Sequence, residues 1–176
     1  MKELSLRYSD ERDKIYGIAG MAITLVACDE EDILSGINID AEPGECLELS
    51  NECALKGNPL LSAKIVWTQS VKDLKTITTL ALGNIACRRY VLSHRSLSSN
   101  DTHDLRHAVR TEALEYCALD TDEADNLFNN CMSYVDRIFR HSGVHDIAHS
   151  FAETLKTKRT MTAVEVIDLL AQLGLR

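Results

Sequence analysis

Apolar side chains recur at helical spacing along the segment from residue 58 to residue 92. Successive members lie three or four positions apart, so they form one stripe along a helix. Asn58 can accept a hydrogen bond from the first turn, and Pro59 loses only an N–H that has no partner there. We therefore predict one long central helix over 58–92, buried along much of its length. The stripe consists of Leu60, Ala63, Trp67, Val71, Leu74, Ile77, Ala81, Ile85 and Leu92.

The later part of this helix has a different pattern, because residues 80–87 are apolar on all sides except at Gly83 and Asn84. A helix that is apolar all round is covered by neighbours on several sides. A Gly inside a helix costs about 1 kcal/mol relative to Ala, so Gly83 indicates the close approach of another helix, or a kink or break. A buried Asn84 needs a hydrogen-bond partner.

The same apolar spacing predicts five further helices, near 11–32, 101–119, 121–141, 144–155 and 163–173. Ser9 or Asp10 is expected to cap the first of them, Asn100 or Asp101 the second, and Thr121 the third. Thr162 forms a capping box with the Glu three residues later. The inner face expected for the helix over 101–119 comprises Leu105, Ala108, Val109, Ala113, Leu114, Tyr116 and Cys117.

Two short stretches, 37–40 and 46–49, alternate apolar and polar residues as strands do. Between them, Pro43 and Gly44 suit the central positions of a type II turn. We predict a small β-hairpin at about 33–50. An isolated hairpin is marginally stable, so its apolar face lies on the helices or pairs with a second copy of the chain.

The predicted fold is therefore mainly α. It is a five- to six-helix bundle around the long central helix 58–92, with one small β-hairpin at about 33–50. A length of 176 residues suits one domain with a substantial core, and no linker or internal repeat divides the chain. We accordingly predict a single domain over residues 1–176.

The charge of the chain is acidic and uneven. The formal net charge is -8, and residues 1–53 hold 4 Lys and Arg against 13 Asp and Glu. An acidic protein has no general attraction for phosphate backbones, so we expect no nucleic-acid partner. The acidic first third is either a solvated face or a docking surface for a basic partner. The run Asp29-Glu30-Glu31-Asp32 sits poorly at a helix C-terminus, so it belongs to a turn or attracts a cation or a basic partner.

The cysteines indicate a reducing compartment. The chain has six of them and no CxxC pair, and several fall within apolar helical patterns. We therefore predict a cytoplasmic protein. A minor alternative arises from residues 25–28, Leu-Val-Ala-Cys, which resemble a bacterial lipoprotein cleavage box that would lipidate Cys28. Residues 1–14 carry four acids and four bases, unlike a signal peptide, and the apolar run 15–28 is too short to span a bilayer. We expect a buried helix there and no membrane partner.

One short motif has a catalytic character, His145-Asp146-Ile147-Ala148-His149. Two His at positions i and i+4 share a helix face and can bind one divalent metal ion. The motif is similar to the zincin HExxH pattern, with Asp146 in place of the Glu. The His-Asp pair also resembles the doublet of HD-domain phosphohydrolases, which are all-helical metal enzymes. That resemblance implies a metal-dependent hydrolase using His145, Asp146 and His149, with His107 as an upstream ligand and Asp168 as a downstream one.

The other interpretation of this motif is structural. Val144, Ile147, Ala148, Phe151 and Leu155 form the apolar stripe that a packed helix needs, and the two His flank it. The chain shows no nucleophile elbow and no Gly-rich phosphate loop. We therefore predict no catalytic and no cofactor-binding residues. The expected function is protein–protein interaction or a structural, adaptor role, with another protein or a second copy as partner. The alternative is the metal-dependent hydrolase.

Overall fold

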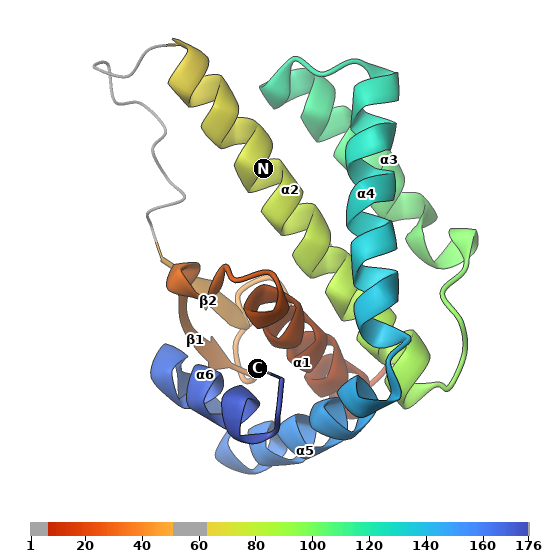
Figure 1. The fold of residues 1–176 in the computed structure, drawn as a ribbon. Coiled ribbons are helices and arrows are strands. Elements are labelled where there is room, and N and C mark those ends of the chain that lie inside the picture. The colour runs from red at the N-terminus through yellow and green to blue at the C-terminus, as the bar shows by residue number, and fades with distance from the viewer. Residues whose placement is uncertain (1–6, 51–62, 176) are drawn as a thin grey trace.

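The computed structural model describes residues 7–50 and 63–175. Within these ranges a 3-10 turn, Glu31–Ile33, precedes the first strand, and a π-helical segment, Cys87–Leu92, continues the second helix. Figure 1 shows the arrangement of the elements. Their order is α1 (Glu11–Ala27), β1 (Leu34–Asn38), β2 (Leu47–Leu49), α2 (Ala63–Ala86), α3 (Ser99–Cys117), α4 (Thr121–Phe139), α5 (Ser142–Lys158), β3 (Thr160–Thr162) and α6 (Ala163–Gln172).

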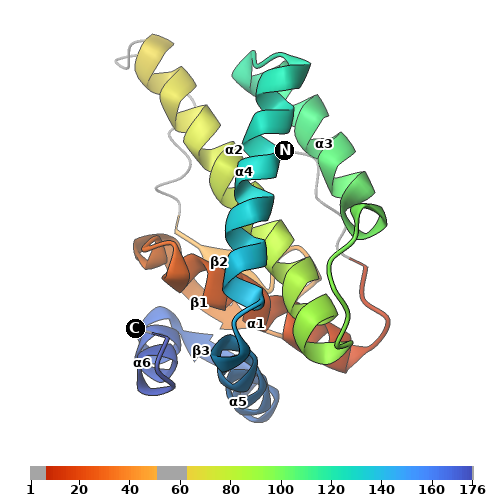
Figure 2. The ribbon, with the colours of Figure 1, turned by 45° about the vertical axis from the view of Figure 1, so that its right-hand side comes forward.

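The molecule has two regions, a base and an arm. The base contains α1, the sheet, α5, α6, the second half of α2 from residue 75 to residue 86, and the π-helical segment Cys87–Leu92. The arm contains α3, α4 and the first half of α2, residues 63–74. Figures 1 and 2 show the arm rising away from the base, with α2 shared between them. The predicted fold class, a mainly α bundle with a small hairpin, is confirmed.

The sheet confirms the hairpin and adds a strand to it. β1 pairs antiparallel with β2 on one side and with β3 on the other, in the order β2-β1-β3. Ile37 of β1 lies opposite both Leu47 and Met161, and all three side chains are buried. The apolar face of the hairpin thus lies on the core of the same chain, as in the first of the two arrangements considered above. The sequence prediction missed β3 because Thr160-Met161-Thr162 alternates as a strand does but is too short to be distinguished from a loop between two helices.

The predicted turn between the strands is present, but its type is different. The Glu45 N–H donates to the Glu42 carbonyl over 2.8 Å, so the chain does turn around Pro43 and Gly44. A type II turn requires a positive φ at its third residue. Gly44 does not have a positive φ, so the type II assignment is wrong.

Helix α1 forms the centre of the base, and 12 of its 17 residues are buried. The apolar run that begins at residue 15 forms the buried part of this helix, as expected. Asp10 caps it by accepting a hydrogen bond from the Asp13 N–H over 2.8 Å. The helix ends at Ala27 rather than at Asp32, because the chain turns at Asp29 with a φ of 54°. Within the described ranges, no helix is both long enough and apolar enough to cross a bilayer.

Glycines bring α1 and α2 into close contact. A Cβ at Gly20 would collide with the backbone oxygen of Gly83, and a Cβ at Gly17 would lie 2.6 Å from the Asn84 side-chain nitrogen. Gly83 therefore marks the close approach of a helix, as predicted. The alternative prediction of a break near Gly83 is wrong, because α2 remains α-helical to Ala86, and the kink stays a prediction. The change in winding comes later, in the π-helical segment, where the Ser93 N–H donates to the Arg88 carbonyl over 3.0 Å.

The burial of α2 changes along its length. Leu74, where the arm meets the base, and Leu80 and Leu82 in the base are buried, whereas Trp67 in the arm is 47% exposed. The prediction of a helix buried along much of its length is therefore confirmed from Leu74 onward and is wrong at Trp67. Asn58, Pro59 and Leu60 lie outside the described residues.

Three predicted helix starts need correction. Asp120 rather than Thr121 caps α4, because the Asp120 side chain accepts a hydrogen bond from the Glu123 N–H over 2.8 Å. Ser98 rather than Asn100 or Asp101 caps α3, and Asp101 supplies the second side chain of that capping box. α5 begins at Ser142 instead of Val144. The capping box at the start of α6 is present as predicted, since the side chains of Thr162 and Glu165 each bond the backbone of the other.

Candidate functional site

The two histidines of the predicted metal site are hydrogen-bonded to different parts of the core. On α5, His145 Nε2 lies 2.7 Å from the Phe139 carbonyl oxygen, so it carries the proton and donates it. His149 Nδ1 lies 2.7 Å from the Tyr16 hydroxyl of α1, and the two rings meet edge to face with centroids 5.5 Å apart. Both His are half-buried and hold α5 against its neighbours.

The other predicted ligands lie on separate surfaces. Asp146 is exposed on α5, His107 is exposed on α3, and Asp168 is exposed on α6. In the part of the chain that the structure describes, no group of three or more His, Cys, Asp or Glu side chains is placed to hold a metal ion. The metal-dependent hydrolase therefore remains a prediction from the sequence, and the arrangement of these residues does not add to it.

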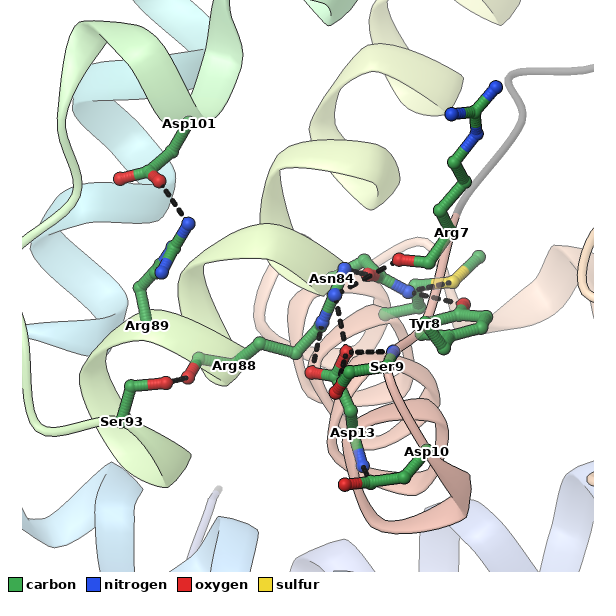
Figure 3. A network of polar contacts seen from close by, with 11 residues as sticks. Arg7, Tyr8, Ser9, Asp10, Asp13, Asn84, Arg88, Arg89, Ser93 and Asp101 are labelled. Atoms are coloured by element: carbon green, nitrogen blue, oxygen red, sulfur yellow. Dashed lines mark hydrogen bonds and ion pairs between the residues drawn. The ribbon is translucent and has the colours of Figure 1, made fainter.

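A buried polar network joins the N-terminal segment, α1 and α2 (Figure 3). Arg88 bonds both carboxylate oxygens of Asp13, each over 2.5 Å. Asn84, which is fully buried, donates to the Tyr8 hydroxyl over 2.9 Å and accepts from Arg88 over 3.4 Å. The partner required by Asn84 is thus present. The Ser9 N–H also donates to Asp13, over 2.9 Å.

The network keeps its charges paired. Burial raises the pKa of Asp13, but hydrogen bonds from Arg88 and Ser9, together with the charge of Arg88, outweigh burial and hold that pKa below its usual range. Burial also raises the pKa of Tyr8, so its hydroxyl stays neutral. A bidentate guanidinium–carboxylate pair is a strong and directional contact. The arrangement explains how α1 and α2 are fastened together, and it leaves no group free to react.

The next arginine along the chain is directed to the other side of α2 (Figure 3). Arg89 forms an ion pair with Asp101 near the start of α3. Hydrogen bonds from Ser98 and the charge of Arg89 outweigh burial and lower the pKa of Asp101. Arg88 and Arg89 of the π-helical segment therefore connect this segment to α1 on one side and to α3 on the other.

The free end of the arm exposes large apolar side chains. Trp67 at the start of α2 is 47% exposed, and on the last turns of α3 Leu114 is 68% and Tyr116 57% exposed. The Trp67 indole N–H donates to the Cys117 carbonyl over 2.6 Å, which fixes the ring against the end of α3. The prediction that Leu114 and Tyr116 belong to the inner face is wrong. Only a narrow stripe of α3 is buried, and it consists of Thr102, Leu105, Val109, Ala113 and Cys117.

The same end of the arm is acidic. Residues 112–125 contain six Asp and Glu and no Lys or Arg. Asp120 and Glu123 form the capping box of α4, and Asp125 accepts hydrogen bonds from Arg106 and Arg110. The other members are Glu112, Glu115 and Asp122. The sequence prediction considered only the acidic first third of the chain, although a charge window over 112–125 would have found this second cluster.

Comparison with models of known protein families and with curated proteins gave no match.

Proposed function

We propose that this protein is a protein-binding module, and that the end of its arm binds a basic amphipathic helix of another protein. One observation carries the proposal: the free end of the arm exposes three large apolar side chains, Trp67 (47%), Leu114 (68%) and Tyr116 (57%). Leu114 and Tyr116 lie on different sides of α3, so a partner helix would contact one of them together with Trp67. Trp and Tyr are the residues that most often contribute strongly to binding free energy in interfaces.

The position of Trp67 favours binding. Its indole N–H is already bonded to the Cys117 carbonyl, so the ring is held in one orientation before a partner arrives. A side chain that is ordered in the free protein loses little conformational entropy on binding. The exposed part of the ring is then available to cover apolar side chains of the partner.

The charge around these residues supports a basic partner. Six acidic residues lie between positions 112 and 125, and interfaces favour complementary charge. A second copy of the chain would bring the same acidic end and a net charge of -8, so self-association at this surface is opposed by repulsion. The five cysteines of the described residues are free thiols, which supports our proposal of a cytoplasmic location.

The proposal can be tested with the intrinsic fluorescence of Trp67, because it is the only Trp in the chain. The probes are two synthetic amphipathic peptides without Trp, one built from Leu and Lys and one from Leu and Glu in the same pattern. We expect the Leu/Lys peptide to shift the Trp67 emission to shorter wavelength and to bind less tightly as salt is raised. The Leu/Glu peptide should leave the emission unchanged.

Two substitutions show whether binding occurs at the arm. Leu114→Gln removes an exposed apolar side chain beside the acidic cluster and should weaken the Leu/Lys peptide about tenfold. Val164→Gln is the matched control, since Val164 is 67% exposed on α6 in the base, and it should have no effect. Equal effects of the two substitutions, or no response to the Leu/Lys peptide, would overturn the proposal. If light scattering showed a dimer whose formation shifts the Trp67 emission in the same way, the partner at this surface would be a second copy of the chain instead of a basic helix.

A further inference from the structure

A cavity of about 300 Å³ lies where the arm meets the base. Its walls come from the end of α1, from residues 75–80 of α2 and from residues 130–134 of α4. This size is at the lower end of the range for small-molecule sites. The cavity is separate from the end of the arm, and the inference below does not depend on the proposed function.

The hydroxyl groups of the cavity already donate their protons within the protein, so they can only accept hydrogen bonds from a ligand. Thr24 donates to the Gly20 carbonyl, Thr79 to the Lys75 carbonyl and Thr76 to a carboxylate oxygen of Glu30, each over 2.7 Å. The Tyr134 hydroxyl likewise donates to the Ala27 carbonyl over 2.6 Å. Since each hydroxyl has a single proton, only lone pairs remain for a ligand. The three Thr are buried, so a ligand that reached them would have to supply hydrogen-bond donors.

The electrostatic surroundings favour a positive charge. Glu30 lines the cavity, and the C-terminal end of α1, which carries the negative end of the helix dipole, opens beside it. Glu30 belongs to the Asp29-Glu30-Glu31-Asp32 run, which sequence analysis associated with a turn or with a cation. Lys75 also lines the cavity and carries the opposing charge, and its side chain is exposed to solvent, which screens that charge.

The rest of the wall is neutral and consists of Asn130, the thiols of Cys28 and Cys131, and the apolar side chains of Leu25 and Leu80. Burial raises the pKa of the Cys28 thiol to about 11, and burial also raises that of Cys131, so neither thiol adds a negative charge near neutral pH. Leu25 and Leu80 complete this side of the cavity and are buried. An apolar body of a few carbon atoms would therefore lie against Leu25 and Leu80 while its polar end met Glu30.

We propose that this cavity binds a small organic amine, with the ammonium group at Glu30 and the Thr hydroxyls and the apolar body against Leu25 and Leu80. The ammonium supplies hydrogen-bond donors to the lone pairs of the Thr hydroxyls and to the Glu30 carboxylate. It also neutralises the Glu30 carboxylate, and charge-assisted hydrogen bonds of this kind are roughly twice as strong as neutral ones.

The test uses hexylamine, cyclohexylamine and phenethylamine, each beside the alcohol and the carboxylate of the same carbon skeleton. Binding is measured by calorimetry on the full chain. Independently, the alkylation rate of Cys28 is followed residue by residue with mass spectrometry at alkaline pH, because Cys28 lines the cavity and is half-buried. We expect at least one amine to bind and to slow alkylation of Cys28, and its alcohol and carboxylate to bind more weakly.

Two substitutions are expected to change the affinity for the amine in opposite directions. Glu30→Gln keeps an oxygen for Thr76 and removes the charge, so it should weaken the amine about fivefold or more. Lys75→Met removes the opposing charge from an exposed position and should strengthen binding about twofold. Asp32→Asn makes the same change of charge as Glu30→Gln at an exposed acid that does not line the cavity, and it should have little effect.

Three results would overturn the proposal. They are the absence of binding by all three amines, stronger binding of the carboxylates, and equal effects of Glu30→Gln and Asp32→Asn. If Glu30→Gln does not fold, Lys75→Met alone decides the question, because an amine and a carboxylate respond to it in opposite directions. Weaker amine binding by Lys75→Met would then contradict the proposed position of the ammonium.

Discussion

Helices α1 and α3 differ sharply in burial although they are similar in length. α1 has 17 residues, of which 12 are buried, whereas α3 has 19 residues, of which 5 are buried. Among the described elements, α1 packs against α2, α4, α5, α6 and the sheet, whereas α3 packs mainly against α2 and α4. The difference indicates that the base supplies most of the stability, while the arm exposes surface that is available for contact.

The composition of the two helices explains this difference. In α1, Gly17 and Gly20 let the backbone of α2 approach, and the surrounding positions are aliphatic or aromatic. α3 carries Asp, Glu, Arg and His at most positions outside its narrow apolar stripe. A helix with one stripe can be covered on one side only. The comparison can be tested by changes made in matched pairs, one in each region.

The largest contrast is expected between Phe151→Ala in the base and Leu114→Ala in the arm. Phe151 is fully buried, so its loss leaves a cavity and should lower the free energy of unfolding by about 4 kcal/mol. Leu114 is 68% exposed, and its replacement should change that free energy by less than about 0.5 kcal/mol. Urea denaturation followed by circular dichroism measures both. Similar losses for the two variants would refute the division into a stabilising base and an exposed arm.

Gly20→Ala tests the contact on which the base is built. A Cβ at this position collides with the backbone of Gly83, which cannot move aside as a flexible side chain could. We expect a loss of about 2 to 3 kcal/mol in the free energy of unfolding. Gly44→Ala is the control, because no atom lies within 4 Å of the added Cβ and φ is not positive there. A neutral Gly20→Ala would show that α1 and α2 can separate without cost.

Asp13→Asn should have a smaller effect, and one that depends on pH. Because the pKa of Asp13 is lowered in the folded protein, the stabilisation is complete above the unfolded pKa of about 3.9 and is lost as pH falls through the folded value. At neutral pH we expect a loss of about 2 kcal/mol, typical of a hydrogen-bonded charge pair. Unfolding free energies measured between pH 3 and pH 7 should fall less steeply with acid in the variant.

The arm offers a comparison for this experiment. Hydrogen bonds from Arg110 also lower the pKa of Asp125, but that ion pair is at the surface. Water and salt screen such a pair, so Asp125→Asn should alter the pH dependence less than Asp13→Asn. If Asp125→Asn altered the pH dependence of the unfolding free energy as much as Asp13→Asn or more, the exposed ion pair of the arm would contribute more than its exposure predicts.

Sequence reasoning succeeded where a local pattern determines the structure. Residues 162–165 contain both halves of a capping box, and Gly83 stands inside an apolar helix, so each has a direct physical consequence. It failed where the outcome depends on the rest of the chain. The exposure of Leu114 and Tyr116 depends on how many neighbours cover α3, and the strand at 160–162 exists only because β1 offers an edge.

The candidate sites show the same limit. The spacing of His145 and His149 is that of two ligands on one helix face, yet the hydrogen-bond partners of both come from Phe139 and Tyr16, which no local pattern connects with them. The cavity at Glu30 gathers residues from three helices that are distant in the sequence. The acidic run at 29–32 was visible in the sequence, but the hydroxyl groups that face it were not.

The pairing of β1 with β3 has a consequence for the order of assembly. Asn38 lies opposite Thr160, so the middle strand of the sheet acquires its second neighbour from a segment made more than a hundred residues later. Contacts so distant along the chain form slowly, because a long loop must close first. During synthesis the helices of the arm emerge and can pack while this edge is still open, and the base is completed only after α6, which ends at Gln172, has left the ribosome.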